Sequence, residues 1–492
     1  MAATEDIDAG TTRPAAGRRM EPETRSIDYV PQSERHGKAW QQAPFWFTGQ
    51  FVPTTMVVGF VGPVLGLSLA WSLVATIAGV LFGTCFMAFH ANQGPTMGLP
   101  QMIQSRAQFG LRGASVPMIA VIGVYLGFSS FGVLLGSQVL ASYLGWTTLG
   151  WSVVIVGLAT GLAIFGYDLL HVVLRWLPYL VVPVFGVLTV LALANLTPAA
   201  PAVGDGFSWA GLLAQFVAAT GYQLGYAVYV SDYSRYLPAD TSQRAVIGWT
   251  YLGACLSALW LMSLGNFIAA SVPVPDALTN LQYVGDQWFD GFGELAVVLV
   301  LIPGAIALMG VNLYGAMLSS LSIVQSFRPS LQASARNRAL GIVGGAVAVF
   351  AVAQWLPASY LGSFNDFVTI MLYVLVPWTA VNLVDYYFVR RGHYAVTEIF
   401  RPDGIYGLWG WRGLLAYVLG LLALAPFVRV GTIEGPLLDD VGGVDLAFVI
   451  GLVVPGLVYG LLTRGHDVAR EEAAVARSRH QLDGDLGVSR GR

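Results

Sequence analysis

Long apolar runs separated by short polar stretches dominate the chain, and this pattern predicts membrane-spanning helices. A hydrocarbon core of roughly 30 Å needs about 20 residues of apolar helix, and about twelve segments reach that length. Most charged residues fall between these segments or in the tails. The predicted spans are 45–66, 69–91, 115–143, 150–166, 174–195, 209–231, 245–271, 295–323, 339–356, 365–389, 412–428 and 445–463.

The composition agrees with a bilayer as the solvent of an all-α polytopic protein. Of the 492 residues, 55% are hydrophobic and 11% are charged, a balance that is untypical of water-soluble globules. Polar residues 1–43 lack the apolar region of a secretory signal, so we expect a disordered tail there and a second tail at 464–492. Cys85 and Cys255 lie in apolar runs, which indicates neither a disulfide framework nor a metal site.

Basic residues are distributed almost entirely to one side of this predicted topology. Lys and Arg are held on the cytoplasmic face during insertion. All but one of the 25 lie in the tails or at the loops that follow even-numbered spans, the exception being Arg429. We therefore expect a multi-pass protein of the cell membrane with both termini in the cytoplasm.

The first predicted span, 45–66, carries a polar patch that would interrupt a straight helix. Its middle contains Gly49, Gln50, Pro53 and Thr54, and the proline removes a backbone donor. Irregular backbone at membrane depth is tolerated only where protein or a watery cavity covers it. This patch is therefore a candidate cavity wall.

The sixth predicted span, 209–231, carries a comparable patch that contains Gly221, Tyr222, Gln223 and Tyr226. The two patches lie five spans apart, which is the spacing expected of an inverted five-helix repeat with helices 1 and 6 broken around a shared site. The alternative is that both are ordinary kinks with small residues at helix contacts.

The loop after the second predicted span contains Gly94-Pro95-Thr96-Met97-Gly98-Leu99-Pro100-Gln101-Met102, followed by Ser105-Arg106 and Phe109-Gly110. Further motifs occur within 166–175, 231–236, 312–314 and 377–392. Together, in this order along roughly residues 40 to 430 of a chain with this hydropathy pattern, they resemble the nucleobase:cation symporter-1 family, and most closely its purine-cytosine permease branch.

The resemblance implies a LeuT-like fold with two inverted five-helix repeats, 44–196 and 207–392, and two additional helices within 412–463. It further implies a secondary active transporter that imports a nucleobase or a similar small flat heterocycle with H⁺ or Na⁺ by alternating access. No cofactor is expected besides the coupling ion, and the expected partners are the substrate, the cation and the lipid bilayer, with no nucleic acid.

A flat heterocycle has two π faces and an edge of donors and acceptors, so its pocket needs aromatic planes and amides. We expect Phe128 to stack on one face and Tyr222 or Tyr226 on the other, while Gln223 and Asn312 read the edge. For each aromatic residue taken alone, the alternative is a position that faces lipid or packs in the core. Gln50 or Thr54 would complete the substrate site, and the predicted gating or structural residues are Gly49, Pro53, Gly221, Gly98 and Pro100.

Two positions depart from the pattern of the family that the chain resembles. Phe128 stands where a tryptophan is usual and keeps an apolar ring for stacking, whereas Gly132 stands where an amide residue is usual and removes a hydrogen-bond partner. Since one hydrogen bond decides between similar rings, the substrate stays open between cytosine, purine, hydantoin, a vitamin ring or an amino acid.

The coupling ion follows from the eighth predicted span, 295–323. The sodium site implied by the fold combines carbonyls of span 1 with hydroxyls of span 8, yet no Ser or Thr occurs from Leu295 to Asn312. A cage of backbone oxygens alone would be a weaker sodium site, so H⁺ is favoured. Asp168, Asp232 and Asp385 lie near the cytoplasmic ends of spans and are interpreted as loop and cap residues.

Other classes of protein fit the sequence less well. A membrane enzyme would need a constellation such as His-Glu-x-x-His, which does not occur. A channel would require a continuous polar stripe or a repeated filter sequence. An amino-acid carrier of the same fold would present a charged or backbone-lined carboxylate site at the broken helices, whereas the two patches offer aromatic rings and neutral amides.

Overall fold

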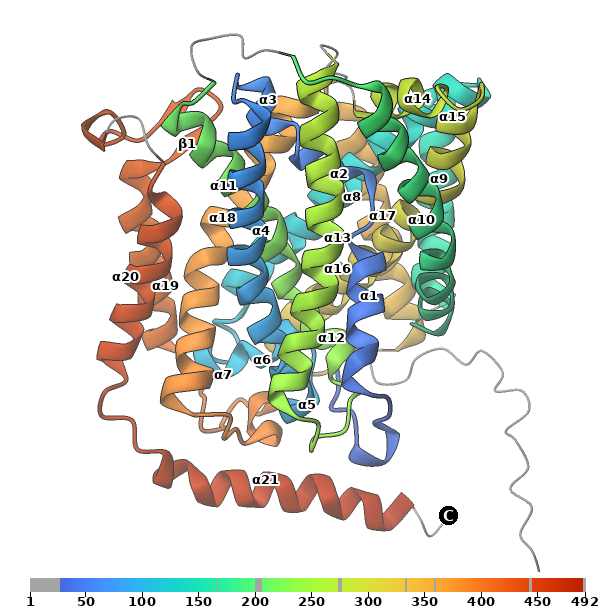
Figure 1. The fold of residues 1–492 in the computed structure, drawn as a ribbon. Coiled ribbons are helices and arrows are strands. Elements are labelled where there is room, and N and C mark those ends of the chain that lie inside the picture. Colours follow the sequence, from blue (N-terminus) through green and yellow to red (C-terminus); the bar gives the residue numbers. More distant parts are fainter. Residues whose placement is uncertain are drawn as a thin grey trace, which may run out of the picture.

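The computed structural model describes residues 27–165, 167–199, 206–272, 277–331, 334–357, 360–441 and 445–489. Its helices run side by side between two faces of a bundle, and α21 (Val468–Ser489) lies across the lower end (Figure 1). Strands within the described ranges are limited to the short hairpin of β1 (Arg429–Val430) and β2 (Ile433–Glu434). The expectation of an all-helical membrane protein with many apolar spans is confirmed.

Seven helical segments of the described chain are long and apolar enough to cross a bilayer. They are built on α4 (Leu69–Ala91), α8 (Ser115–Leu144), α10 (Tyr167–Asn195), α13 (Gln243–Ser271), α16 (Ile302–Phe327), α17 (Ala335–Trp355) and α18 (Tyr360–Val384). Shorter apolar helices are α9 (Thr148–Phe165), α19 (Trp411–Leu424) and α20 (Ala447–Leu462).

The first predicted span, 45–66, is divided into α1 (Gln42–Gly49), α2 (Pro53–Val58) and α3 (Val61–Val64). Val52 is extended, with φ −136°, and Pro53 opens α2 at a position where its missing N–H is not needed. The predicted gating residue Gly49 is the last residue of α1.

The sixth predicted span also changes its helical path. It consists of α11 (Trp209–Gly225), the 3-10 turn η3 (Tyr226–Val228) and α12 (Val230–Ser234). Tyr229 separates the last two with φ −139° and ψ 7°.

Side chains from neighbouring helices satisfy the backbone groups that the divided first span leaves free. Gln215 of α11 accepts a hydrogen bond from the Gly62 N–H at 2.7 Å and donates one to the Val58 carbonyl at 3.0 Å. Asn266 of α13 donates to the Gly59 carbonyl at 2.5 Å. In a bilayer an unpaired backbone group is costly, so these two buried amides permit the irregular path.

Glycines allow α4 to pack closely on α11. A Cβ atom at Gly79 would lie 2.6 Å from the Phe216 carbonyl oxygen, and one at Gly83 would lie 2.6 Å from that of Thr220. Small residues at such positions let two backbones approach in a membrane protein. α4 also packs against α13, while α8 packs against α16 and α1 against α13.

The N-terminal segment from residue 27 onward packs against the loop after α4, so the described chain begins inside the predicted tail 1–43. Arg35 is buried and donates to the Val30 carbonyl at 2.9 Å and to the Pro95 carbonyl at 2.5 Å. Gly98 adopts φ +66°, and a Cβ there would lie 2.0 Å from an Arg35 nitrogen. Gly98 therefore has a structural role in holding this segment, and residues 1–26 lie outside the described ranges.

The predicted C-terminal tail, 464–492, contains the helix α21. Ala474, Val475 and Ser478 are buried, and the Ser478 hydroxyl accepts a hydrogen bond of 3.0 Å from the Thr397 N–H. The remaining short elements are η1 (Gln32–Glu34), η2 (Ala39–Gln41), α5 (Gln93–Met97), α6 (Gln101–Gln104), α7 (Arg106–Phe109), α14 (Ala277–Gly285), α15 (Phe292–Ala296), η4 (Val297–Leu301), η5 (Asp385–Val389), η6 (Val396–Phe400), η7 (Ala425–Phe427) and η8 (Asp439–Val441).

The contact between α2 and α13 gives a test of the packing. A Cβ at Gly265 would lie 2.3 Å from the Met56 carbonyl oxygen, so we expect Gly265→Ala to lower the free energy of unfolding by about 1–3 kcal/mol. Gly248→Ala in the same helix, where a Cβ meets nothing within 4 Å, should match or exceed wild type. Thermal unfolding of the detergent-purified proteins measures both, and equal melting of the two variants would contradict the packing.

Candidate functional site

A small cavity lies where the first span is interrupted and α8 and α16 pass beside it. Its volume is about 20 Å³, which holds a water molecule but not a heterocycle. A ligand of that size would therefore need the surrounding side chains to move apart. The lining residues are Val52, Pro53, Thr54, Phe128, Ser129, Gly132, Ala305, Leu308, Met309 and Asn312.

Asn312 of α16 supplies the cavity with an amide. Its side chain is 3% exposed, and its Oδ1 atom accepts no hydrogen bond from the described residues. A buried acceptor without a partner is costly, so this oxygen is suited to receive an N–H from a ligand or a bond from water. Of the predicted substrate-binding residues, the structure brings Asn312, Thr54 and Phe128 to one cavity.

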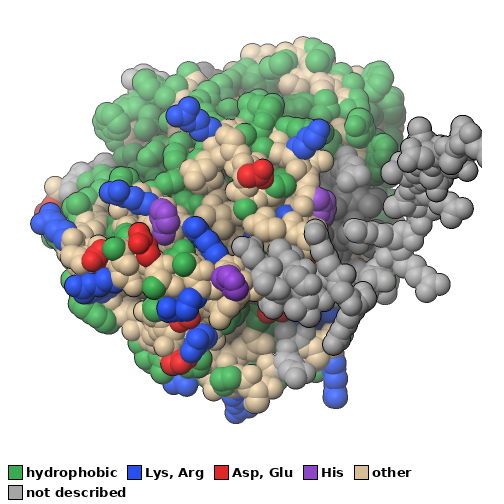
Figure 2. Space-filling view, turned by 90° about the horizontal axis from the view of Figure 1, so that it is seen from below, with side chains coloured by type: hydrophobic (Ala, Val, Ile, Leu, Met, Phe, Trp, Pro, Cys, Tyr) green, Lys and Arg blue, Asp and Glu red, His purple; other side chains and the backbone are tan. Residues whose placement is uncertain are grey.

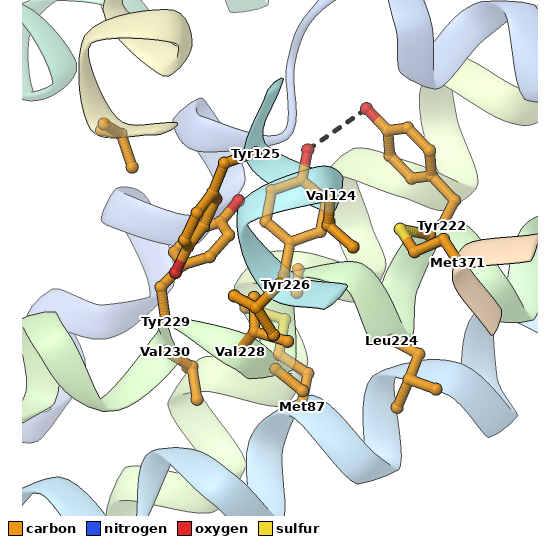
Figure 3. Close-up of a cluster of buried hydrophobic side chains, with 14 of the residues drawn as sticks. Met87, Val124, Tyr125, Tyr222, Leu224, Tyr226, Val228, Tyr229, Val230 and Met371 are labelled. Atoms are coloured by element: carbon orange, nitrogen blue, oxygen red, sulfur yellow. Dashed lines mark hydrogen bonds between the residues drawn. The ribbon is translucent and has the colours of Figure 1, made fainter. Parts of the chain in front are cut away.

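The Tyr222 hydroxyl joins the two interrupted spans. It lies 2.9 Å from the Thr54 hydroxyl and 2.7 Å from that of Thr55, and it accepts a bond of 3.2 Å from Tyr226 (Figure 3). The Thr55 hydroxyl in turn donates to the Gln50 carbonyl at 2.5 Å. Tyr222 thus holds α11 against the start of α2, beside the cavity rather than in its wall.

Aromatic rings from three helices meet at Phe128. Its ring contacts Tyr222 of α11 with centroids 5.4 Å apart and Phe367 of α18 at 5.1 Å, both nearly perpendicular. Because Phe128 and Tyr222 touch each other edge to face, a planar ligand could lie between them only after the rings separate. The two rings are in direct edge-to-face contact here, and their stacking on the two faces of a ligand stays a prediction.

Two of the predicted substrate-binding residues, Gln223 and Gln50, point toward α4 instead of the cavity. Gln223 donates a hydrogen bond of 2.6 Å to the Thr84 hydroxyl, and Gln50 contacts the Met87 sulfur at 3.6 Å. Neither side chain lines the cavity. The Oε1 atoms of both are buried without a hydrogen-bond partner among the described residues.

The predicted structural residues have distinct surroundings. A Cβ at Gly221 would lie 3.1 Å from the Val368 carbonyl oxygen, so this glycine brings α11 close to α18. Pro53 lines the cavity at the start of α2, and Pro100 precedes α6 as its cap residue.

The sequence interpretation missed part of the cavity wall. Ala305, Leu308 and Met309 line it together with Asn312. They precede Asn312 by seven, four and three residues, which is the spacing of one helix face. The spacing alone could have identified them once Asn312 was chosen. Thr55, which bonds to Tyr222, carried no signal beyond its place in the polar patch.

Asp385 lies in a buried polar cluster at the lower end of α18. Its carboxylate accepts hydrogen bonds from Gln108 and Tyr394 at 2.7 Å and from Tyr459 at 2.9 Å, and Arg390 pairs with it at 2.5 Å. These contacts join three separate parts of the chain, since Arg390 and Tyr394 follow Asp385 closely while Gln108 and Tyr459 are distant.

The other two aspartates differ in what the structure describes. Asp232 accepts a bond of 2.7 Å from the Gln101 N–H, a loop and cap contact like the one expected from the sequence. The side chain of Asp168 lies outside the described residues.

Comparisons with known proteins agree on one family. The family model described as permease for cytosine/purines, uracil, thiamine, allantoin matches residues 29–451. The putative purine-cytosine permease YxlA of Bacillus subtilis is 37% identical over 449 residues, covering 90% of this chain and 96% of the relative. The allantoin permease of Bacillus subtilis is 23% identical and covers 90% of this chain and 94% of its own length.

Solved structures agree on the fold. Mhp1, a nucleobase-cation-symport-1 family transporter in a closed conformation with bromovinylhydantoin bound, matches with a TM-score of 0.71 at 17% identity, covering 92% of this chain and 98% of that chain. Inward-facing Mhp1 matches with a TM-score of 0.69 at 18% identity, covering 93% of this chain and 98% of that chain. With the family model and the 37% identical relative, these matches make the chain a member of the nucleobase:cation symporter-1 family, a multi-pass membrane permease rather than an enzyme.

Proposed function

We propose that this permease imports a nucleobase or a similar small flat heterocycle by cation symport through the cavity between α2, α8 and α16. The observation that carries the proposal is that an aromatic ring, a hydroxyl and an amide from Phe128, Thr54 and Asn312 meet at an interrupted span, and that the buried amide oxygen has no hydrogen-bond partner among the described residues. Rings of this class need a π surface and a few directional polar partners. A vitamin, a hydantoin or an amino acid carried by the same fold is the alternative.

The proposed architecture has twelve spans, with two inverted five-helix repeats followed by two additional helices. Contacts between helices support it. A pair of spans that pack together in the structure has a matching pair in which each span is exchanged for its counterpart in the other repeat, five places away. α1 packs on α13 and, correspondingly, α11 packs on α4; α8 packs on α17 as α16 packs on α9. Exchange of partners between two repeats is what interlocked inverted repeats produce.

The proposed orientation places both termini in the cytoplasm. The described chain begins and ends at the lower face of Figure 1, as an even number of spans requires. The face seen from below carries Lys, Arg and His side chains (Figure 2), in agreement with retention of basic residues on the cytoplasmic side.

Substrate recognition is proposed to begin with separation of Phe128 from Tyr222. The perpendicular contact between these rings and the hydroxyl bonds of Tyr222 to Thr54 and Thr55 are neutral interactions, each worth about 0.5–1.5 kcal/mol. A ligand that stacks on Phe128 and accepts or donates at Asn312 could replace them at little net cost. Three further predicted residues do not line the cavity in this structure. Rotation of the interrupted helices about their axes would be needed to bring them to the ligand; they are Tyr226, Gln223 and Gln50.

Proton coupling is favoured by the wall that α16 presents to the first span. A Cβ at Gly304 would lie 3.2 Å from the Phe51 carbonyl oxygen, so this carbonyl of the interruption faces the part of α16 before Asn312, which has no Ser or Thr. A sodium cage at this place would need hard oxygen ligands from α16. Because this part of α16 offers no hydroxyl group, we favour H⁺ as the coupling ion.

Removal of the Asn312 amide tests the substrate site. We expect Asn312→Ala to lower uptake of the best-bound heterocycle at least about tenfold, because the ligand edge loses its partner. A thermal-shift screen of nucleobases, hydantoins and heterocyclic vitamins identifies that ligand, whose stabilising effect the variant should lose. Asn195→Ala, which removes an exposed amide at the end of α10, is the control, and an unchanged ligand shift in Asn312→Ala would exclude Asn312 from the site.

Restoring an amide in α8 tests the role of the departure at Gly132. This glycine lines the cavity, and a Cβ there meets nothing within 4 Å, so a side chain can start at this position without a backbone shift. We expect Gly132→Asn to strengthen binding of cytosine or a purine by about two- to tenfold through one added hydrogen bond. Gly132→Ala fills the space without the amide and should not gain affinity; equal effects of both variants would refute the assignment.

The coupling ion can be measured in proteoliposomes. We expect full uptake in sodium-free buffer with an inward proton gradient and its collapse when a protonophore is added. Strict dependence on sodium would instead require a cation site that uses the carbonyls of the interrupted first span.

A further inference from the structure

A second, larger cavity opens at the lower end of the bundle, between the end of α18 with η5 and the end of α20 with the start of α21. Its volume is about 530 Å³, so it is far roomier than the central cavity. Its wall carries three arginines and two histidines but no carboxylate: Arg390, Arg391, Arg464, His393 and His466.

Carboxylates outside the pocket wall pair with only some of the cationic side chains of this basic pocket. Arg390 pairs with Asp385 at 2.5 Å and with Glu471 at 3.1 Å, and His466 lies 3.5 Å from Glu471. Arg391 and Arg464 make no side-chain hydrogen bond or ion pair with any described residue, and both are exposed. Two cations therefore remain available to an anion inside the pocket.

The backbone turn at the end of η5 fixes one of these cations. Arg391 adopts φ +51°, followed by Gly392 at +77°. Positive φ is uncommon for arginine and persists where the surrounding structure determines it. Here the Gly392 N–H bonds to the Tyr386 carbonyl at 3.0 Å, which closes the turn and keeps Arg391 at the wall of the pocket.

The same pocket borders the apolar outer surface of the membrane helices. Phe388, one of its lining residues, is 73% exposed, and Leu457 and Leu461 on α20 are 63% and 52% exposed. Large apolar side chains exposed at this level of a membrane protein face acyl chains. The pocket thus combines a cationic interior with an apolar rim, which matches the two parts of a phospholipid.

We infer that this basic pocket binds the phosphate headgroup of an anionic phospholipid, whose acyl chains lie along Phe388 and α20. Guanidinium groups bind phosphate oxygens through paired, charge-assisted hydrogen bonds, and basic pockets between membrane helices on the cytoplasmic side suit anionic headgroups. Because its wall includes both η5 and Val468 of α21, the bound lipid would tie the C-terminal helix to α18.

The test measures lipid retention by the full-length permease rather than transport. The purified protein is reconstituted in vesicles of phosphatidylcholine alone or mixed with phosphatidylglycerol, and native mass spectrometry counts the lipid that stays bound after extraction. Wild type should retain phosphatidylglycerol in preference to phosphatidylcholine. The double variant Arg391→Gln/Arg464→Gln should bind it about thirtyfold more weakly, since each arginine near an anionic surface contributes about a fivefold gain.

Matched variants keep the result interpretable. Arg336→Gln removes an exposed arginine in the first turn of α17, outside the pocket, and should retain the lipid like wild type. If the double variant does not fold, Arg464→Gln alone should weaken retention about fivefold.

Three outcomes would overturn the inference. They are equal retention of both lipids by wild type, unchanged retention by the folded arginine variants, and complete displacement of phosphatidylglycerol by inorganic phosphate at equal concentration, which would identify a site for free phosphate.

Discussion

The structure depends on the requirement that every backbone polar group inside a bilayer finds a partner within the protein. A continuous helix meets this requirement alone, whereas the interrupted first span cannot. Gln215 and Asn266, which are buried on α11 and α13, meet it by bonding to Gly62, Val58 and Gly59. Helices α11 and α13 must therefore stand next to the break between α2 and α3, which fixes their place beside the first span.

That constraint also explains how much of the site could be predicted from the sequence. Polar residues in apolar spans are costly unless they are covered, so they marked the two interruptions and singled out Thr54 and Asn312. Phe128 was singled out by the family resemblance, and all three residues line one cavity. The directions of Gln50 and Gln223 could not be predicted in the same way. Consecutive helical residues point about 100° apart, and the partners of these glutamines, Met87 and Thr84, lie on another helix.

Elements outside the bilayer were the least predictable part of the fold. α21 is polar along its length, so hydropathy gave no reason to expect a packed helix, and its burial depends on contacts such as Ser478 with Thr397. The order of the N-terminal segment was equally hard to predict. Arg35 is held against the Pro95 carbonyl, and this contact depends on the left-handed backbone of Gly98, more than sixty residues further along the chain. In both cases a distant segment decides the local structure.

The cluster around Asp385 has a consequence for the synthesis of the chain. Tyr459, which donates a hydrogen bond to this carboxylate, lies 74 residues after Asp385. Glu471 pairs with Arg390 and lies 81 residues after that arginine. At about 5–20 residues per second, ribosomes need roughly 4–15 s to reach Tyr459. During that time η5 and its cap residue carry an aspartate and an arginine that α20 and α21 cannot yet cover, so the lower end of the bundle reaches its final packing only when the last helices arrive.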